Sequence, residues 1–228
     1  MKTKSRIQPV IPRKKILLMD DHPMTRYGLA QLISREADLQ VYGEVENVRQ
    51  AFAAIKLPLP DLVLADISMP GKSGLEFIKD MQALYPAIPV LILSMHDESI
   101  YAERVLHVGG RGYIMKSEGG EKLLAAIRRV LQGEVYVSNS VSASILNLLS
   151  KSKPGREARL LSALTDREFE VFRLLGQSLS TTEIGQRLQI SGKTVETHRL
   201  HAKEKLNLKT GAELIQHAVR WVVAQGMI

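Results

Sequence analysis

Several polar side chains stand directly after short apolar runs in the first half of the chain. They are Asp20, Asp21, Asp66, Ser94 and Lys116. If the runs end at one place, three carboxylates gather there and repel one another unless a cation neutralises them. Hard oxygen ligands favour Mg²⁺, which keeps several of its waters. A carboxylate beside Mg²⁺ and a lysine could attack phosphorus and form an acyl phosphate, with a serine hydroxyl donating to a phosphoryl oxygen.

The apolar runs are predicted to be the strands of one parallel sheet. Each run is short and lacks alternation, which is typical of strands buried on both faces. The predicted strands are residues 16–19, 39–45, 62–65, 90–93 and 112–115. Amphipathic segments predict helices at residues 24–34, 48–55, 75–84, 99–108 and 121–131. Five strand–helix repeats indicate an open, doubly wound α/β sheet, in which the carboxyl ends of the strands share one edge.

Residues that begin or end helices support these boundaries. Pro23 suits the first turn of a helix, and Asn47 can cap the helix after the second strand. Gly133 can end the fifth helix. A further helix is predicted at residues 138–149.

The last part of the chain has no strand pattern and is predicted to be four helices. Ser or Thr followed three residues later by Glu marks helix starts at Thr165, Ser180 and Thr210, and Ser191 offers a cap alone. Two of the helices, 182–188 and 193–206, are joined by a tight turn at residues 189–192. This arrangement places the second helix for the major groove of DNA.

The charge of the chain is distributed in a way that fits a nucleic-acid partner. Residues 1–135 carry 18 Lys and Arg against 16 Asp and Glu, whereas residues 136–228 carry 13 against 8. The shorter part is therefore the more basic per residue. By itself this signal is weak, because many other domains are as basic.

The first half of the chain resembles a known family through its ordered and correctly spaced motifs. These are MDDHP (19–23), DISMPGKSG (66–74), LSMHD (93–97) and GGRGYIMK (109–116). They resemble the receiver domain of a two-component response regulator, and more narrowly that of the NarL/FixJ family. The resemblance implies a flavodoxin-like receiver in which Asp66 accepts a phosphoryl group.

The same resemblance assigns roles to the residues around Asp66. It implies that Asp21, Asp66 and the main-chain carbonyl of Ser68 bind Mg²⁺ directly, and that Asp20 helps through water. Lys116 would contact the phosphoryl group. Ser94 and Tyr113 would form the switch pair that responds to phosphorylation.

Two positions depart from the usual receiver pattern. Ser117 stands where many receivers have a proline after the lysine, and Ser94 stands where many have threonine. The hydroxyl of Ser94 survives, so the switch role can hold. The geometry of the Lys116–Ser117 peptide is left open by the sequence.

Residues 164–221 resemble the LuxR-type helix-turn-helix that follows NarL/FixJ receivers. At about 100° per residue, Val195, Ala202 and Leu206 of its second helix point toward the core. Leu200 points away from the core, where a thymine methyl group would suit it. The predicted DNA-binding residues are Lys193, Thr194, Glu196, Thr197, Arg199, Leu200, Lys203 and Lys209.

The last predicted helix, residues 211–225, has two apolar stripes. The stripe expected to face the core consists of Ala212, Ile215, Val219 and Val222. The second consists of Leu214, Ala218 and Trp221. It is either a widening of the core face or a dimer contact, which the family uses in its DNA-bound form. A two-fold dimer would match a two-fold DNA site.

The predicted organisation is a disordered tail at 1–14, a receiver domain at 15–136, a partly helical linker at 137–160 and a LuxR-type helix-turn-helix domain at 161–228. The start has no signal peptide, no apolar run is long enough to span a membrane, and there is no cysteine. A cytoplasmic location is expected. The resemblance implies a sensor histidine kinase, double-stranded DNA and RNA polymerase as partners, and a homodimer on activation.

Two other functions are compatible with some of these residues. Aspartyl-phosphate hydrolases use a similar sheet, but they usually carry a second Asp two residues after the nucleophile, where this chain has Ser68. A regulator that acts without phosphorylation would also retain an acidic pocket. The sequence favours a phosphorylation-activated transcription regulator that is not an enzyme.

Overall fold

The computed structural model describes residues 12–69, 72–150, 161 and 163–224. Most of the predicted tail and residues 151–160 of the predicted linker lie outside these ranges. The chain folds as two compact units, and the first unit ends at Ser138.

The first unit alternates strands and helices along the chain. The strands are β1 (Lys14–Met19), β2 (Leu39–Val45), β3 (Leu62–Ala65), β4 (Val90–Ser94) and β5 (Gly112–Met115). The helices are α1 (Pro23–Ser34), α2 (Val48–Ala54), α3 (Gly74–Leu84), α4 (Glu98–His107) and α5 (Gly120–Leu131), with a short 3₁₀ turn, η1 (Lys116–Glu118), before α5. Each bound lies within two residues of the predicted one.

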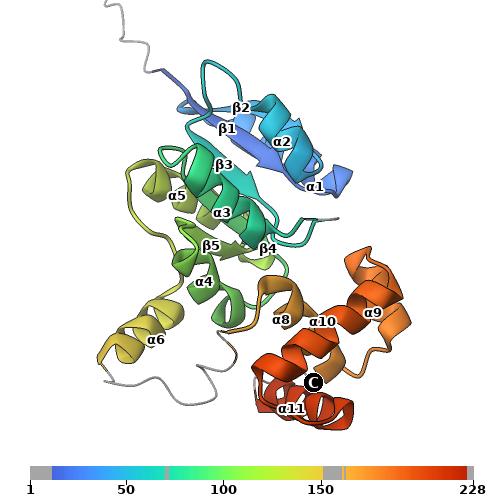
Figure 1. Ribbon diagram of the computed structural model, residues 1–228. Helices are drawn as coiled ribbons and strands as arrows, with labels where there is room; N and C mark the ends of the chain where they lie inside the picture. Colours follow the sequence, from blue (N-terminus) through green and yellow to red (C-terminus); the bar gives the residue numbers. More distant parts are fainter. Residues whose placement is uncertain (1–11, 70–71, 151–160, 162, 225–228) are drawn as a thin grey trace, which may run out of the picture. The chain divides into compact units, whose positions relative to one another are not determined.

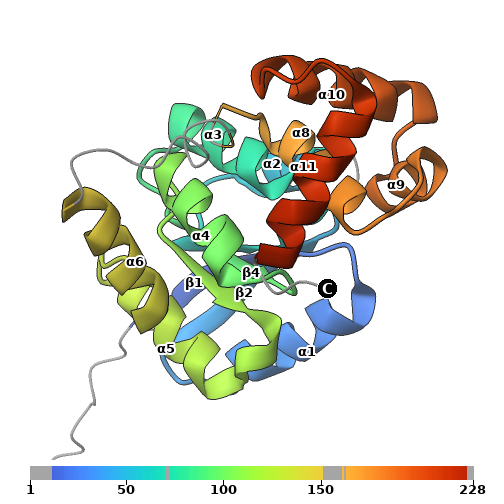
Figure 2. The same cartoon turned by 90° about the horizontal axis from the view of Figure 1, so that it is seen from below.

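The five strands form one parallel sheet in the order β2-β1-β3-β4-β5. Helices cover both of its faces: α2, α3 and α4 lie on one side, and α1 and α5 lie on the other (Figures 1 and 2). The predicted doubly wound α/β fold is therefore confirmed. In register, Met19 pairs with Ala65 and Ala65 pairs with Ile92. The loops that follow these strands consequently leave the sheet at the same edge.

Buried aliphatic side chains hold each helix layer against the sheet. On the side of α1 and α5, Leu18, Leu64 and Leu91 pack with Ile33 and Ile127 in one cluster. Burying a side chain of this kind stabilises the fold by about 1.5–3 kcal/mol. This layer therefore fixes the strands whose ends carry the polar residues.

The predicted helix boundaries have the expected local causes. Pro23 is the first residue of α1. The side chain of Asn47 accepts a hydrogen bond from the N–H of Gln50 at 3.0 Å and so caps α2. Gly133 follows α5 with a φ of +87°, which a residue with a side chain rarely adopts. All three predictions are confirmed.

The chain beyond α5 pairs with the edge of the sheet. Tyr136 accepts a hydrogen bond from the N–H of Tyr113 at 2.9 Å and donates one to the carbonyl of Arg111 at 3.0 Å. Two residues later, the N–H of Ser138 donates to the carboxylate of Glu98 in α4 at 2.6 Å. The segment that leaves the first unit is thus bonded to both β5 and α4.

The second unit is helical throughout its described elements. These are α6 (Asn139–Ser150), α8 (Asp166–Gly176), α9 (Thr181–Leu188), α10 (Gly192–Lys205) and α11 (Gly211–Ala224). The predicted helix at 138–149 is confirmed by α6. No described helix is long and apolar enough to cross a membrane.

Capping side chains begin the helices of the second unit as predicted. Thr165 and Ser180 form reciprocal capping boxes with Glu168 and Glu183. Ser191 caps α10 by accepting from the N–H of Thr194 at 3.1 Å. These caps fix where α8, α9 and α10 begin.

The third predicted box, at Thr210, differs in detail. Thr210 accepts from the N–H of Glu213 at 3.1 Å, but the Glu213 carboxylate accepts from the N–H of Lys209 at 2.8 Å. The reciprocal bond therefore reaches one residue further back than in a capping box.

The two stripes of α11 are exchanged relative to the prediction. Leu214 and Ala218 are buried, whereas Ile215 is 39% exposed. The reason is α8: a Cβ at Gly176 would lie 2.5 Å from the carbonyl oxygen of Ala218, so the two backbones are in close contact there. Leu214 and Ala218 cannot form a surface contact between molecules, and their assignment to the dimer contact was wrong.

Trp221, the third residue of that predicted dimer contact, also packs within the second unit. Its ring meets Phe169 edge-on, with centroids 5.3 Å apart, and lies 5.9 Å from the ring of Phe172. Both phenylalanines belong to α8. Of the stripe predicted to face the core, Val222 alone is fully buried.

Candidate functional site

Carboxylates from two separate loops meet at the carboxyl edge of the sheet. One side-chain ligand atom from each of Asp20, Asp21, His22 and Asp66 lies within 4.8 Å of the others. We call these four residues the acidic cluster. Asp20, Asp21 and His22 follow β1, and Asp66 follows β3. The predicted convergence of the three aspartates is therefore found in the structure.

Lys116 joins the acidic cluster from the end of β5. Its Nζ lies 2.6 Å from Asp20 Oδ2 and 2.6 Å from Asp66 Oδ2. Burial alone would lower the pKa of Lys116, but the carboxylates of Asp66 and Asp20 outweigh it and raise that pKa. Lys116 therefore keeps its positive charge between two buried carboxylates, where an incoming phosphoryl group would also need it.

The donor set of the acidic cluster fits a divalent cation. Carboxylate oxygens are the hard ligands that Mg²⁺ prefers. Asp21 Oδ1 is buried, and His22 Nδ1 lies 2.8 Å from it. Carboxylates gathered this closely repel one another, and a bound cation would relieve that repulsion. Ser68 is exposed two residues after Asp66, and its carbonyl stays a predicted ligand.

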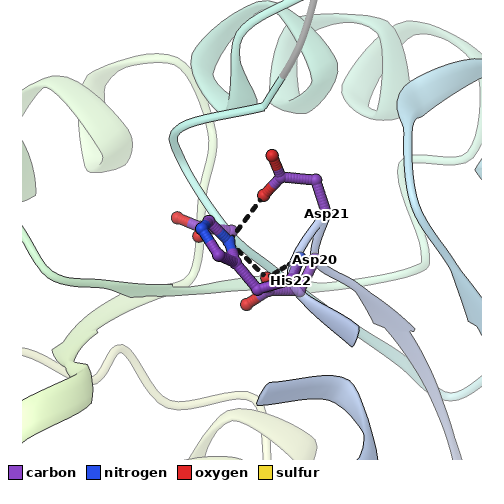
Figure 3. A group of neighbouring side chains, drawn as sticks. Asp20, Asp21 and His22 are labelled. Carbon is purple, nitrogen blue, oxygen red and sulfur yellow. Dashed lines mark hydrogen bonds and ion pairs between the residues drawn. The ribbon is translucent and has the colours of Figure 1, made fainter. Parts of the chain in front are cut away.

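His22 belongs to this site although sequence reasoning assigned it no role. Figure 3 shows its imidazole between the carboxylates of Asp20 and Asp21. Its Nδ1 lies 3.2 Å from Asp20 Oδ1 and 2.8 Å from Asp21 Oδ1. Its main-chain N–H also donates to Asp20 Oδ1 at 2.8 Å. The position directly after two aspartates was the signal that could have identified it.

The predicted switch residues lie side by side in the protein interior. Ser94 and Tyr113 are both fully buried. The Tyr113 hydroxyl donates to the carbonyl of His96 at 2.9 Å, and the N–H of His96 donates to Ser94 Oγ at 3.1 Å. Burial raises the pKa of the Tyr113 phenol, and a hydrogen bond with Ser94 lowers it in part. One loop, through His96, therefore links the two side chains.

The helix α10 presents the face expected for a DNA reader. Val195, Ala202 and Leu206 are buried, as predicted from its periodicity. Leu200 on the opposite side is 47% exposed. Most of the other predicted DNA-binding residues are exposed, and Thr194, Arg199 and Lys203 are partly buried.

Two of these predicted contacts are bound to neighbours within the unit. Arg199 Nη1 lies 2.7 Å from Glu196 Oε1 and donates to Thr181 Oγ1 at 2.9 Å. Thr181 in turn donates to Glu196 at 2.8 Å. This triad fixes α10 to the start of α9 and reduces the free charge of both ionic side chains. Sequence reasoning missed Thr181, since only the fold brings it to α10.

Comparison with known proteins agrees with both units. Residues 16–128 match the response regulator receiver domain, and residues 162–218 match the bacterial regulatory proteins of the luxR family. The chain is 33% identical over 211 residues to the oxygen regulatory protein NreC of Staphylococcus epidermidis, covering 90% of this chain and 97% of the relative.

Solved structures give the same result. A two-component response regulator of the LuxR family from Aurantimonas sp. SI85-9A1 is 29% identical, with a TM-score of 0.56, over 61% of this chain and 99% of that one. The RcsB response regulator of Salmonella typhimurium is 25% identical, with a TM-score of 0.52, over 90% of this chain and 97% of that one. Its structure was described for its conformational dynamism in DNA interaction.

An acidic cluster on a parallel α/β sheet, followed in the same chain by a helix-turn-helix, is typical of a response regulator. The match to NreC extends over 97% of that relative and so includes both domains. The chain belongs to the NarL/FixJ family, with a receiver domain and a LuxR-type helix-turn-helix. It is a phosphorylation-activated transcription regulator of a two-component system.

Proposed function

We propose that Asp66 is the phosphoacceptor and that the acidic cluster holds Mg²⁺ during phosphoryl transfer. The observation that carries this proposal is Lys116 Nζ, which lies 2.6 Å from both Asp20 and Asp66 inside the cluster. A lysine in that position neutralises charge on a phosphoryl group attached to Asp66. When Mg²⁺ is bound, it supplies the further positive charge that the phosphoryl oxygens require.

The position of Asp66 in the sheet supports its assignment as the phosphoacceptor. Lys116 bonds equally to Asp20 Oδ2 and Asp66 Oδ2, at 2.6 Å each. Asp66 also follows the central strand β3, between β1 and β4. It therefore stands between the cation-binding aspartates and Ser94.

The proposed donor is the phosphohistidine of a sensor histidine kinase. A carboxylate oxygen of Asp66 attacks phosphorus, the P–N bond of the donor breaks, and the bonding electron pair leaves with the imidazole nitrogen. Lys116 keeps its proton throughout and stays paired with the product phosphoryl group. Asp21 would hold the cation from the adjacent loop.

Phosphorylation would act on the rest of the receiver through Ser94. Its hydroxyl now bonds to Tyr113 and to His96, and a phosphoryl oxygen on Asp66 competes for it. Tyr113 then changes position. Because the segment at Tyr136 and Ser138 is bonded to β5 and α4, a shift of these elements reaches the chain that leads to the DNA-binding domain.

We further propose that α10 reads base edges in the major groove through Lys193, Thr197 and Leu200. Lys203, Lys209 and the amide groups at the start of α10 would contact phosphates. The homodimer would use the exposed side of α11, where Ile215 and Val223 are 39% and 57% exposed. Such a dimer would recruit RNA polymerase from a two-fold DNA site in the cytoplasm.

The proposed domain limits are 15–136 for the receiver, 137–160 for the linker and 161–228 for the DNA-binding domain. The 3₁₀ turn at Lys116–Glu118 occupies the position where many receivers have the proline.

Replacing the phosphoacceptor tests this function directly. Asp66→Asn is expected to abolish acyl phosphate formation from a small phosphodonor in the presence of Mg²⁺, because an amide oxygen is a poor nucleophile. Asp97→Asn is the matched control, since Asp97 lies on the same edge and caps α4. Stoichiometric labelling of the Asp66→Asn protein would refute the assignment.

A second experiment tests the coupling to DNA. The phosphorylated protein is used to select bound DNA from a random pool, and the affinity for the selected site is measured with and without phosphodonor at one salt concentration. Tighter binding after phosphorylation is expected. Equal affinity would mean that the chain regulates without phosphorylation.

A further inference from the structure

Arg26 in α1 holds the loop that carries two of the aspartates of the acidic cluster. Its Nη1 donates to the main-chain carbonyl of Asp20 at 2.6 Å, and its Nη2 lies 2.9 Å from Glu46 Oε1. The Arg26 side chain is 12% exposed, whereas that of Glu46 is 54% exposed. One nearly buried guanidinium therefore connects α1, the loop after β1 and the turn after β2.

We propose that Arg26 is a positioning residue for the cation site, and that it acts through the Asp20 carbonyl. This inference rests on the proposed function of the acidic cluster. The Asp20 carbonyl belongs to the planar peptide unit that joins Asp20 to Asp21. Fixing its direction fixes how the side chains of both aspartates leave the backbone.

The other side of Asp20 is already held by the sheet. Its N–H donates to the carbonyl of Val45 at 3.1 Å, which continues the pairing of β1 with β2. Arg26 provides the bond on the carbonyl side, where the sheet has ended. The planar guanidinium of arginine, with several donors in fixed directions, holds a carbonyl oxygen and a carboxylate at once better than the flexible ammonium group of lysine.

A purely electrostatic role of Arg26 predicts the opposite effect on cation binding. Arg26 is a cation near a site for another cation, so removing its charge would strengthen Mg²⁺ binding. Removing a residue that positions the ligands weakens binding instead. The sign of the change in Mg²⁺ affinity therefore separates the two roles. A role in general stability would change the unfolding free energy and leave the affinity as it is.

The test is calorimetric titration of Mg²⁺ into the unphosphorylated full-length protein. Arg26→Gln is expected to raise the Kd for Mg²⁺ about tenfold or more, as loss of residues that orient metal ligands does elsewhere. Arg26→Lys keeps the charge but not the fork, and should fall between wild type and Arg26→Gln. Arg49→Gln on α2 is the control with the same change of charge, and Arg49 is exposed. Its Kd should match that of the wild type.

Glu46→Gln provides a variant that leaves Arg26 and the Asp20 carbonyl intact. It should raise the Kd only slightly, because Glu46 holds the guanidinium and not the aspartates. The rate of phosphorylation by a small phosphodonor is then measured over a range of Mg²⁺ concentrations. For Arg26→Gln, the concentration giving half-maximal rate should rise, and the rate at saturating Mg²⁺ should approach that of the wild type.

The outcomes separate this inference from the proposed function. If the wild type binds no Mg²⁺, the cation site and the role of Arg26 are both wrong. If the wild type binds Mg²⁺ and Arg26→Gln binds it equally or more tightly, the positioning role alone is overturned. A maximal rate that stays low for Arg26→Gln at saturating Mg²⁺ would also overturn it, since the defect would then not lie in cation binding.

Discussion

At the scale of single residues, Glu168 shows how one carboxylate can tie two helices together. It accepts from the N–H of Thr165 at 2.7 Å and from Lys205 Nζ of α10 at 2.7 Å. Burial would raise the pKa of Glu168, but Lys205 and the Thr165 N–H outweigh it and lower that pKa below its ordinary 4.5. The stabilising contribution is therefore fully present above the unfolded pKa and is lost as pH falls through the folded pKa.

We expect Glu168→Gln to lower the free energy of unfolding by about 1 kcal/mol near pH 7, and by less near about pH 3. Urea unfolding followed by the fluorescence of Trp221, the only tryptophan, measures this change, because its ring packs against α8. Glu204→Gln on the exposed side of α10 is the control. An equal loss at both pH values would show that the ionised carboxylate is not the cause.

Part of the acidic cluster could be predicted from the sequence, residue by residue. Asp20, Asp66 and Lys116 could be predicted to meet because each directly follows a strand of one parallel sheet, and strand ends are fixed by chain position. The position of His22 after two aspartates indicated that it lies near the cluster, but the bonds that His22 and Arg26 make with Asp20 could not be predicted. They depend on side-chain rotamers and on the direction of a single carbonyl group, which no spacing in the sequence encodes.

At the scale of elements, the close approach of α8 and α11 depends on Gly176. A Cβ there would lie 2.5 Å from the carbonyl oxygen of Ala218 and 2.5 Å from Val222 Cγ2. Gly176→Ala must therefore separate the two helices, and we expect it to reduce the free energy of unfolding by about 1–3 kcal/mol. Urea unfolding with Trp221 fluorescence is the measurement.

Gly211→Ala is the matched control, because the nearest atom to a Cβ at that position is Arg199 Nη2 at 3.9 Å. It lies at the start of α11 and should leave the stability unchanged or slightly higher, since alanine loses less backbone entropy on folding. If both substitutions destabilise equally, the backbone contact at Ala218 is not what limits residue 176.

The same pair of helices shows why α11 was harder to predict than the strands. A buried parallel strand is apolar on both faces, so its position follows from the apolar run alone. In α11, two apolar stripes compete for the core, and the choice depends on the partner helix. Because Gly176 has no Cβ, Ala218 can pack against α8 while Ile215 stays exposed. This preference is set by a residue about 40 positions away in the sequence.

At the scale of the whole molecule, affinity for DNA and preference for a base sequence should belong to different residues. Lys209 is exposed at the turn before α11, where we propose that it contacts a phosphate, whereas Leu200 is exposed on the side of α10 that we propose reads bases. Phosphate contacts release counterions and make affinity depend on salt, and base contacts do not. The two kinds of contact can therefore be separated by measuring affinity over a range of salt concentrations.

For the phosphorylated protein on its selected site, Lys209→Ala should reduce the slope of log affinity against log salt by about 0.9 per copy bound. Base preference should stay the same. Leu200→Ala should keep the slope and reduce discrimination at one base pair by about 1–3 kcal/mol. Lys122→Ala on α5 removes the same charge outside the DNA-binding unit and should alter neither quantity. Leu200→Ala could instead change the salt slope and preserve the base preference. In that case α10 contacts the phosphates of DNA and does not read bases through this face.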